Sequence, residues 1–226
     1  MKLLIIRHGA PDYAKDCLTE EGIGQAKKLR QRLEGADIAK VYTSTMGRAM
    51  ETAAICTEGR GLVTEKCDWL REFAVGINMG DKKQSVLSWD LQPEYRDSFF
   101  FDREKQYLSP VLAGTEFSSR YEMLCEGLDR ILEEHGLARE GDSYIKKGDT
   151  DITLALFCHF GTTCVIAARL LGVAPMVFLT GMSEEPTAVT TICTDDRFGR
   201  RVNFRLHGYG DISHLEGHIS AGVAYK

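Results

Sequence analysis

Short apolar runs alternate with longer segments of helical periodicity, and this alternation is the strongest constraint on the fold. Residues 3–6 form a continuous apolar run that ends at Arg7, which is typical of a strand buried on both faces. Thr19 precedes a stretch with apolar residues at helical spacing that stops at Gly35, and this predicts a capped amphipathic helix. The same patterns predict further strands at residues 39–44, 62–67 and 152–157, and further helices at 46–57, 116–135 and 162–171. This order predicts a parallel sheet covered by helices.

Two segments depart from the alternation. From about residue 73 to residue 115 aromatic and charged side chains are interleaved and no long helix or strand period survives up to the next helix, so we interpret this segment as an inserted lid or specificity segment. Residues 188–194 and 200–207 flank a polar connection that contains Gly199, which predicts a hairpin and an antiparallel edge strand. Because no repeat, linker or low-complexity tract divides the chain, residues 1–226 are expected to form a single domain.

Composition narrows the partners and the location. The chain carries a net charge of −5, so no global positive field favours nucleic acid or an anionic membrane, and an anionic substrate needs a local basic cluster. The seven cysteines include no CxxC pair, which indicates reduced, mostly buried thiols. The N-terminal apolar run is far shorter than a signal-peptide core or a membrane span of about 20 residues. We therefore expect a cytoplasmic protein without a metal site.

Polar and charged side chains follow the predicted strands at the points where they end. In an open parallel sheet, ligands bind at the carboxyl ends of the strands, so these side chains are expected to converge on one edge. Arginine forks match a tetrahedral phosphate, and a helix N-terminus beside them adds backbone donors. The edge is therefore expected to bind a phosphoryl group. The residues concerned are Arg7, His8, Ser44, Arg48, Glu72 and His159.

Two histidines and a carboxylate suit phosphoryl transfer in two steps. A neutral imidazole can attack phosphorus, and a protonated one can stabilise charge on the transferring oxygens, so His8 and His159 can divide these roles. Glu72 is the candidate acid that gives the leaving alkoxide its proton. The competing interpretation of Glu72 is a surface pair with Arg71, worth under about 1 kcal/mol. Ser44 can cap the following helix and bind phosphate at the same time.

Four motifs in this order resemble those of the histidine phosphatase superfamily, also called phosphoglycerate mutase-like. They are Arg7-His8-Gly9, Ser44-x3-Arg48-x2-Glu51-Thr52-Ala53, Leu70-x-Glu72 and the late strand that ends in His159, and the closing Ser213-His214-Leu215 is similar to the family's usual end. The resemblance implies a three-layer α/β/α sandwich, phosphorylation of His8, and phosphoryl binding by Arg7, Arg48 and His159. It also implies that Glu72 is the proton donor, because Phe160 occupies the position of the donor aspartate in the acid phosphatase and phytase branch.

The function implied is hydrolysis of a small phosphorylated metabolite through a phosphohistidine, with no cofactor; a homodimer is compatible with it. A phosphoglycerate mutase is the first alternative, although Ala10-Pro11-Asp12-Tyr13 replaces the mutase pattern of Glu, a hydroxyl residue, Trp and Asn. A non-catalytic module that binds a phosphorylated ligand is the second, and it should lack the nucleophile or the acid. Phosphate release measured against isomerised product separates the three.

Several further side chains have two interpretations. Cys158 precedes His159, but neighbours on a strand point to opposite faces, so we expect Cys158 in the core. His207, His214 and His218 lie near Asp211, and without a helical pattern to fix a metal site they are expected to dock the C-terminus. Asp12 and Glu116 are the acids to examine if Glu72 is not the donor. The insertion leaves its own alternatives open, an aromatic or apolar substrate group beside Trp89, Tyr95 and Phe99, or a second phosphate beside Lys82, Lys83, Arg96 and Arg103.

Overall fold

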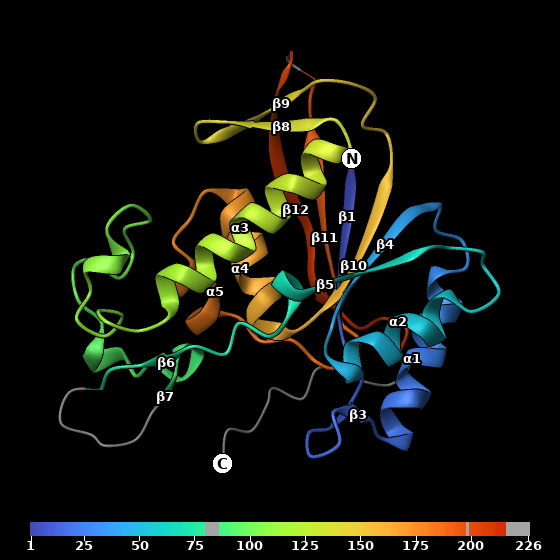
Figure 1. Cartoon of the computed structure of the whole chain (residues 1–226), viewed down its shortest axis with the longest axis horizontal. Coiled ribbons are helices and arrows are strands. Elements are labelled where there is room, and N and C mark those ends of the chain that lie inside the picture. Colours follow the sequence, from blue (N-terminus) through green and yellow to red (C-terminus); the bar gives the residue numbers. More distant parts are fainter. Residues whose placement is uncertain (80–85, 198, 216–226) are drawn as a thin grey trace.

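An eight-stranded mixed sheet forms the centre of the computed structural model, which describes residues 1–79, 86–197 and 199–215 (Figure 1). The neighbouring strands β5 (Thr64–Cys67), β4 (Ile38–Ser44), β10 (Thr153–Cys158) and β1 (Lys2–Arg7) run parallel. The sheet continues antiparallel through β11 (Val189–Asp195), β12 (Arg201–Asp211), β9 (Ser143–Lys146) and β8 (Leu137–Glu140). The α/β class with a parallel core is confirmed.

Helices cover both faces of the sheet (Figure 1). Strand β1 places Leu4 and Ile6 in one hydrophobic cluster with Leu29 of α1 (Glu20–Leu33) and Ala53 of α2 (Gly47–Thr57). The alternate side chains of β1, such as Ile5, belong to the larger cluster, which contains residues of α3 (Phe117–Glu134), α4 (Phe160–Leu171) and α5 (Pro175–Gly181). Because alternate residues of a strand point to opposite faces, the continuous apolar run of β1 is buried on both sides. The result is the three-layer sandwich.

The first helix begins as its sequence predicts. The side chain of Thr19 accepts a hydrogen bond from the Gly22 amide, and Glu20 and Glu21 lie in the first turn. A cap of this kind is worth about 1 kcal/mol, and the acidic side chains complement the helix dipole. The other predicted strands and helices also match within two residues at each end, except that β12 continues to Asp211, four residues beyond its predicted end.

The antiparallel half is larger than the single edge strand expected. The hairpin of β11 and β12 is present, but β11 pairs with β1 inside the sheet, and β8 and β9 add a second hairpin at the edge. Strands β8 and β9 are four residues each and contain charged side chains, so they lack the apolar run that marks the central strands. Gly141 adopts a positive φ of 59° at their turn.

The described part of the 73–115 segment contains no α-helix. It forms the short pair β6 (Gly76–Ile77) and β7 (Val86–Leu87) and the 3-10 turns η2 (Ser88–Asp90), η3 (Pro93–Tyr95) and η4 (Gln106–Leu108). Another 3-10 turn, η1 (Asp68–Leu70), lies just before it, and β2 (Pro11–Asp12) pairs with β3 (Cys17–Leu18) in the loop after β1. Phe100, Val111 and Leu112 of the segment belong to the main core, so the segment is anchored by its own apolar residues.

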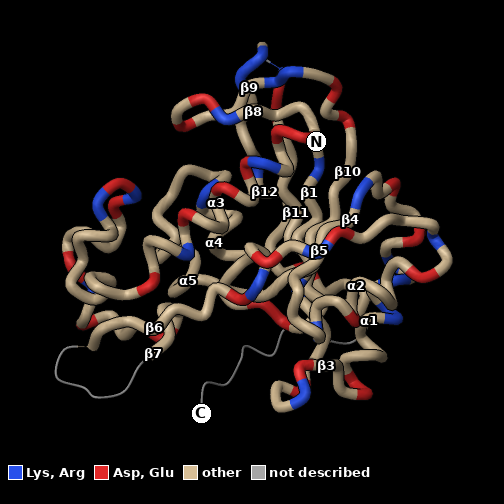
Figure 2. The backbone as a smooth tube through the Cα atoms, in the orientation of Figure 1, with Lys and Arg blue, Asp and Glu red and all other residues tan. Residues whose placement is uncertain are grey.

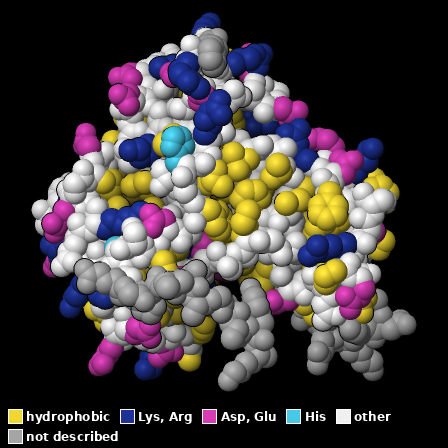
Figure 3. All heavy atoms as spheres, turned by 180° about the vertical axis from the view of Figure 1, so that it is seen from behind, with side chains coloured by type: hydrophobic (Ala, Val, Ile, Leu, Met, Phe, Trp, Pro, Cys, Tyr) yellow, Lys and Arg dark blue, Asp and Glu magenta, His cyan; other side chains and the backbone are white. Residues whose placement is uncertain are grey.

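Charged side chains of both signs are interspersed along the chain. In Figure 2, Lys and Arg lie among Asp and Glu along the whole backbone, and the opposite face in Figure 3 also carries both signs. Any basic site is therefore local. The thiols of Cys56, Cys67, Cys125, Cys158 and Cys164 are buried and free, as expected. Within the described residues, no helix combines the length and the apolar character needed to span a membrane.

Candidate active site

The carboxyl ends of β1, β10 and β4 lie side by side and carry the expected residues. Arg7 ends β1 opposite Cys158, the last residue of β10, and Ser44 ends β4. His159 then precedes α4 as its N-cap residue. The parallel pairing of the three strands brings these positions to one edge of the sheet, where the sequence predicts them. We call this edge the rim.

His8 is held with one ring nitrogen tied to the backbone. Its Nδ1 lies 2.7 Å from the carbonyl oxygen of Gly9, and Arg48 Nε lies 3.1 Å from its Nε2. A carbonyl can only accept, so Nδ1 carries the hydrogen, and the lone pair of the neutral ring is on Nε2. The ring is 1% exposed. Burial, aided by Arg7 and Arg48 and opposed by the bond to Gly9, lowers the pKa of His8 to about 3.

His159 lies beside His8, with 5.0 Å between the ring centroids. Its Nε2 lies 2.8 Å from Ser44 Oγ, and its buried Nδ1 has no hydrogen-bond partner among the described residues. The pKa of His159 is lowered to about 2, mainly by burial and further by the neighbouring His8 and Arg48. Both rings are therefore neutral at physiological pH.

The tautomer of His8 can be measured directly. We expect the ring nitrogens of His8 and His159 to keep the shifts of neutral imidazole from pH 8 down to about 5, since burial disfavours the charged ring. Two-dimensional ¹H–¹⁵N correlation spectra of the imidazoles should also show that His8 is protonated on Nδ1. The urea-unfolded chain is the control, because its histidines should titrate near the ordinary value of about 6.5. A His8 ring protonated on Nε2, or titrating near that value, would contradict the arrangement.

Arg48 is oriented by an aspartate that the sequence analysis missed. Arg48 Nη1 donates to Asp16 Oδ1 at 2.6 Å, and the Gly47 amide donates to Asp16 Oδ2 at 2.7 Å. Burial alone would raise the pKa of Asp16, but these hydrogen bonds outweigh it and lower the pKa. A Cβ at position 47 would stand 2.0 Å from the Asp16 carbonyl oxygen, so this approach requires glycine. Asp16, with a φ of 51°, thus clamps the guanidinium against His8.

Glu72 is fixed by two backbone amides rather than by Arg71. Its Oε1 accepts hydrogen bonds from the Phe73 and Gly161 amides, both at 2.9 Å. Arg71 Nη1 instead donates to Thr45 Oγ1 at 3.2 Å. Burial raises the pKa of Glu72, although Arg7 and the two amides oppose the shift. A carboxyl in this environment is protonated more readily than one on the surface, which suits an acid.

The two alternative acids lie elsewhere. Asp12 Oδ1 accepts from the Ala14 and Lys15 amides within its own turn. The side chain of Glu116 is 79% exposed, and its nearest cation is Arg120 at 4.0 Å. Neither carboxylate is among the described residues that line the cavity at the rim.

A second buried carboxyl, Glu184, was also missed by the sequence analysis. Arg7 Nη1 donates to the Glu184 main-chain carbonyl. The side-chain Oε1 of Glu184 accepts a hydrogen bond from Thr190 Oγ1 at 2.7 Å, while Oε2 of Glu184 has no partner among the described residues. Burial raises the pKa of Glu184 to about 7, with the bond from Thr190 and the charge of Arg7 opposing it. Glu184, Glu72 and Arg7 line the same cavity.

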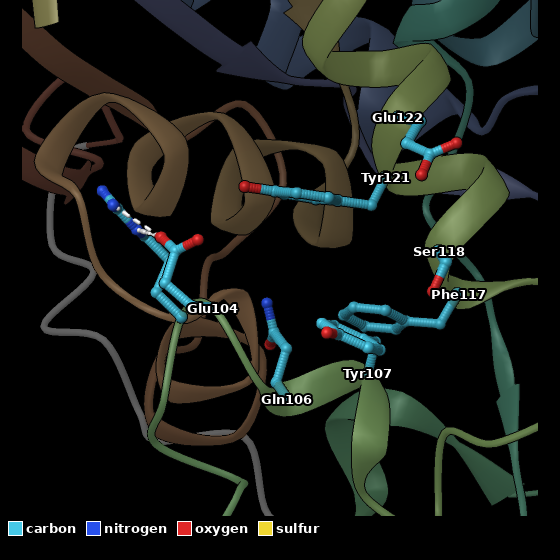
Figure 4. Close-up of a pocket in the computed structure, with 8 residues that line it drawn as sticks. Glu104, Gln106, Tyr107, Phe117, Ser118, Tyr121 and Glu122 are labelled. Carbon is cyan, nitrogen blue, oxygen red and sulfur yellow. Dashed lines mark hydrogen bonds and ion pairs between the residues drawn. The ribbon is translucent and has the colours of Figure 1, made fainter. Parts of the chain in front are cut away.

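A cavity of about 210 Å³ opens at the rim. Besides Arg7 and the two carboxyls, its described walls include Tyr13 and Trp89, and also Phe160. A second cavity of about 380 Å³ lies between the insertion and α3 (Figure 4) and shares none of these described residues. In Figure 4 the side chains of Gln106, Tyr107 and Tyr121 face one another across it.

The cations proposed from the sequence for a second phosphate do not line the rim cavity where they are described. Arg103 lines the second cavity and is paired with Glu104 and Asp142. The guanidinium of Arg96 lies 5.2 Å from the centroid of the Phe100 ring. Lys82 and Lys83 lie outside the described residues.

The C-terminal histidine His214 docks on the loop behind His8. Its Nε2 lies 2.9 Å from Thr187 Oγ1, and the Thr187 amide donates to the His8 carbonyl at 3.1 Å. Docking of the tail through a histidine is therefore as expected, while His218 lies outside the described residues. The described residues contain no group of three side chains arranged to hold a metal ion.

Comparison with known proteins gives one consistent result. The family model for the histidine phosphatase superfamily (branch 1) matches residues 3–205. A protein named adenosylcobalamin/alpha-ribazole phosphatase from Salmonella typhimurium is 35% identical in an alignment of 188 positions that covers 76% of this chain and 80% of that protein. A protein of the same name from Salmonella typhi is 39% identical over 189 residues, with the same coverage.

Solved structures share the fold. The protein YhfR from Bacillus stearothermophilus superposes with a TM-score of 0.62 at 26% identity, covering 95% of this chain and 99% of that one. The alpha-ribazole phosphatase from Shigella flexneri superposes with a TM-score of 0.59 at 18% identity, covering 94% and 97%. Both likenesses therefore extend over nearly the whole chain.

Proposed function

This chain belongs to the histidine phosphatase superfamily and is a phosphatase, and we propose that it hydrolyses phosphomonoesters through a phosphohistidine on His8. One observation carries the proposal: the His8 ring is neutral, is fixed by the Gly9 carbonyl, and presents the lone pair of Nε2 beside the guanidinium of Arg48. A neutral imidazole nitrogen next to a fixed cation is suited to attack a phosphoryl group.

In the first step, Arg48 gives up its hydrogen bond to Nε2 of His8, the freed lone pair forms a bond to phosphorus, and the bond between phosphorus and the ester oxygen breaks. The proton of the Glu72 carboxyl moves to that oxygen, so the product leaves as an alcohol. Arg48 and Arg7 neutralise the charge on the phosphoryl oxygens, and Asp16 keeps Arg48 in position. The unpartnered Nδ1 of His159, with Ser44 on the other ring nitrogen, supplies a further contact to a phosphoryl oxygen.

In the second step, water attacks the phosphohistidine. Glu72, now a carboxylate, accepts a proton from the water, the bond between Nε2 and phosphorus breaks, and the electron pair returns to His8. Inorganic phosphate leaves and both side chains regain their starting protonation. The two rings therefore divide the work, His8 as nucleophile and His159 as a binding group.

The substrate class is a small phosphorylated metabolite, which fits the phosphatases to which the chain is similar. We favour hydrolysis over the mutase reaction because the Tyr13 side chain beside the rim is 69% exposed, whereas phosphoryl return to a second hydroxyl requires a site that excludes water. The 73–115 segment contributes Trp89 to the cavity, which supports its role as a specificity segment. The cytoplasmic location and the homodimer stay predictions.

The proposal is tested by phosphate release from p-nitrophenyl phosphate with excess EDTA. Activity should persist at its full level, because in the proposed mechanism Arg7 and Arg48 supply the charge that stabilises the transferring group and His8 supplies the nucleophile. The same samples, given phosphorylated metabolites, should release inorganic phosphate without forming an isomerised product. Strict dependence on added Mg²⁺, or isomer formation in place of phosphate release, would overturn the proposal.

A further inference from the structure

The rim cavity indicates which alcohols the phosphatase accepts, an inference that rests on the proposed function. Glu72 Oε1 and Trp89 Cζ3 each lie 2.9 Å from the point where a Cβ of Gly161 would stand. The acid and the indole therefore meet over the same glycine. Since Glu72 gives its proton to the ester oxygen, the carbon chain attached to that oxygen must pass beside Trp89.

Aromatic rings from three separate segments surround that path. Trp89 comes from the insertion, Phe160 from the first turn of α4 and Tyr13 from the loop after β1. Trp89 and Phe160 pack edge to face, with 5.8 Å between their centroids and an interplanar angle of 71°. A planar ring placed against these walls gains apolar burial and the favourable geometry of aromatic pairs.

The charges of the cavity disfavour an acidic substrate group. Among the described lining residues Arg7 is the cation, and in the proposed mechanism it binds the phosphoryl group. Glu72 and Glu184 also line it. A second phosphate or a carboxylate on the leaving group would meet no further described cation there, so it would lose its hydration without an ion-pair partner.

We propose that Tyr13, Trp89 and Phe160 form a subsite for the alcohol part of the substrate, and that the preferred substrates are monophosphates of uncharged alcohols that carry an aromatic ring. This chooses between the two alternatives that the sequence leaves open. Of the insertion's candidate side chains, Trp89 lines the cavity, while Arg96 and Arg103 lie against other groups.

Three esters with the same kind of leaving alkoxide test the subsite: 2-phenylethyl, 2-cyclohexylethyl and propyl phosphate. We expect kcat/KM to be about thirtyfold higher for the phenyl ester than for the propyl ester, because a buried ring is favourable. The value of kcat/KM should be about two- to tenfold higher for the phenyl ester than for the cyclohexyl ester, because only the aromatic ring gains from the preferred geometry of aromatic pairs. 3-Phosphoglycerate, with its carboxylate, should be poorer than the propyl ester.

Two variants locate the effect. Trp89→Ala should lower kcat/KM for the phenyl ester about tenfold more than for the propyl ester, mainly through KM. Tyr107→Ala, which removes an exposed aromatic ring of the same insertion at the second cavity, should leave the preference unchanged.

The outcomes separate the subsite from the chemistry. Equal kcat/KM on all three esters would overturn the subsite while the phosphatase function stands. So would equal losses of kcat/KM on the phenyl and propyl esters in Trp89→Ala. A cyclohexyl ester that matches the phenyl ester would overturn its aromatic character. Preference for 3-phosphoglycerate would favour an anionic group instead. Failure to release phosphate from any ester would overturn the proposed function itself.

Discussion

Replacing His8 with alanine should lower phosphate release by about ten-thousand-fold, the largest effect we expect from any single substitution. The nucleophile is lost, and in the proposed mechanism Glu72 already serves as the acid and His159 already binds a phosphoryl oxygen, so neither replaces it. Losses of this order are typical when a residue that forms a covalent intermediate is removed. Initial rates with p-nitrophenyl phosphate measure the effect.

The covalent step needs its own measurement. Wild-type protein mixed with a ³²P-labelled ester and quenched in alkali should retain label on one histidine, and the label should be lost in acid. His8→Ala should retain none. His207→Ala is the matched control, since His207 is an exposed histidine on β12, and it should keep both label and activity. Substantial activity in a folded His8→Ala protein, judged by its circular dichroism, would show that the nucleophile is another group.

The rim could be predicted from the sequence because it depends on topology rather than on detailed packing. Residues that follow parallel strands meet at one edge of the sheet whatever their side chains do. Arg7, Ser44 and His159 are of this kind, and their positions follow once β1, β4 and β10 are recognised. Arg48 lies one helical turn after Ser44, so its position also follows from the local sequence.

The residues that were missed depend on contacts between distant segments. Asp16 lies in a short loop with no periodicity, and only the folded chain brings its carboxylate to Gly47 and Arg48. Glu184 lies in an irregular segment after α5, and its burial follows from the packing of β11 beside it. The glycine at position 47, at the start of a helix, was the one local signal that another backbone approaches closely there. Similarly, the edge strands β8 and β9 are too short and too polar for a periodic pattern.

Gly161 joins two parts of the site that lie far apart in the sequence. In the structure its amide donates to Glu72, and its missing Cβ leaves room for both that carboxyl and Trp89. The position therefore links the acid to the subsite for the alcohol, a relation that no pattern within the chain reports.

Glu72→Gln should affect substrates according to how much their leaving groups need a proton. An alkoxide leaves poorly without one, so hydrolysis of propyl phosphate should fall by about a hundredfold or more, the usual contribution of a general acid. Nitrophenolate leaves without a proton, so p-nitrophenyl phosphate should lose less than about tenfold. Glutamine keeps the oxygen that accepts from the Phe73 and Gly161 amides, and the geometry of the site should therefore persist.

The pH dependence gives an independent test of the same residue. Burial raises the pKa of Glu72 and thus favours its protonated form, whereas the charge of Arg7 lowers this pKa. When the dianionic phosphoryl group binds, it neutralises the charge of Arg7. With substrate bound, kcat for propyl phosphate should be high below the raised pKa of Glu72 and should fall as the pH rises through it. This alkaline limb should be weak for p-nitrophenyl phosphate and absent in Glu72→Gln.

Glu184 is the group that could imitate such a limb, because its pKa is raised to about 7 and it lines the same cavity. Glu184→Gln is therefore the matched control. If Glu72 is the acid, Glu184→Gln should retain the alkaline limb. It should also change the rates on propyl phosphate and p-nitrophenyl phosphate by the same factor. A limb that disappears in Glu184→Gln and persists in Glu72→Gln would transfer the acid to Glu184. Equal losses on both esters in Glu72→Gln would show that the Glu72 carboxyl acts on a step that the two esters share and does not protonate the leaving group, because only a proton donor distinguishes an alkoxide from a nitrophenolate.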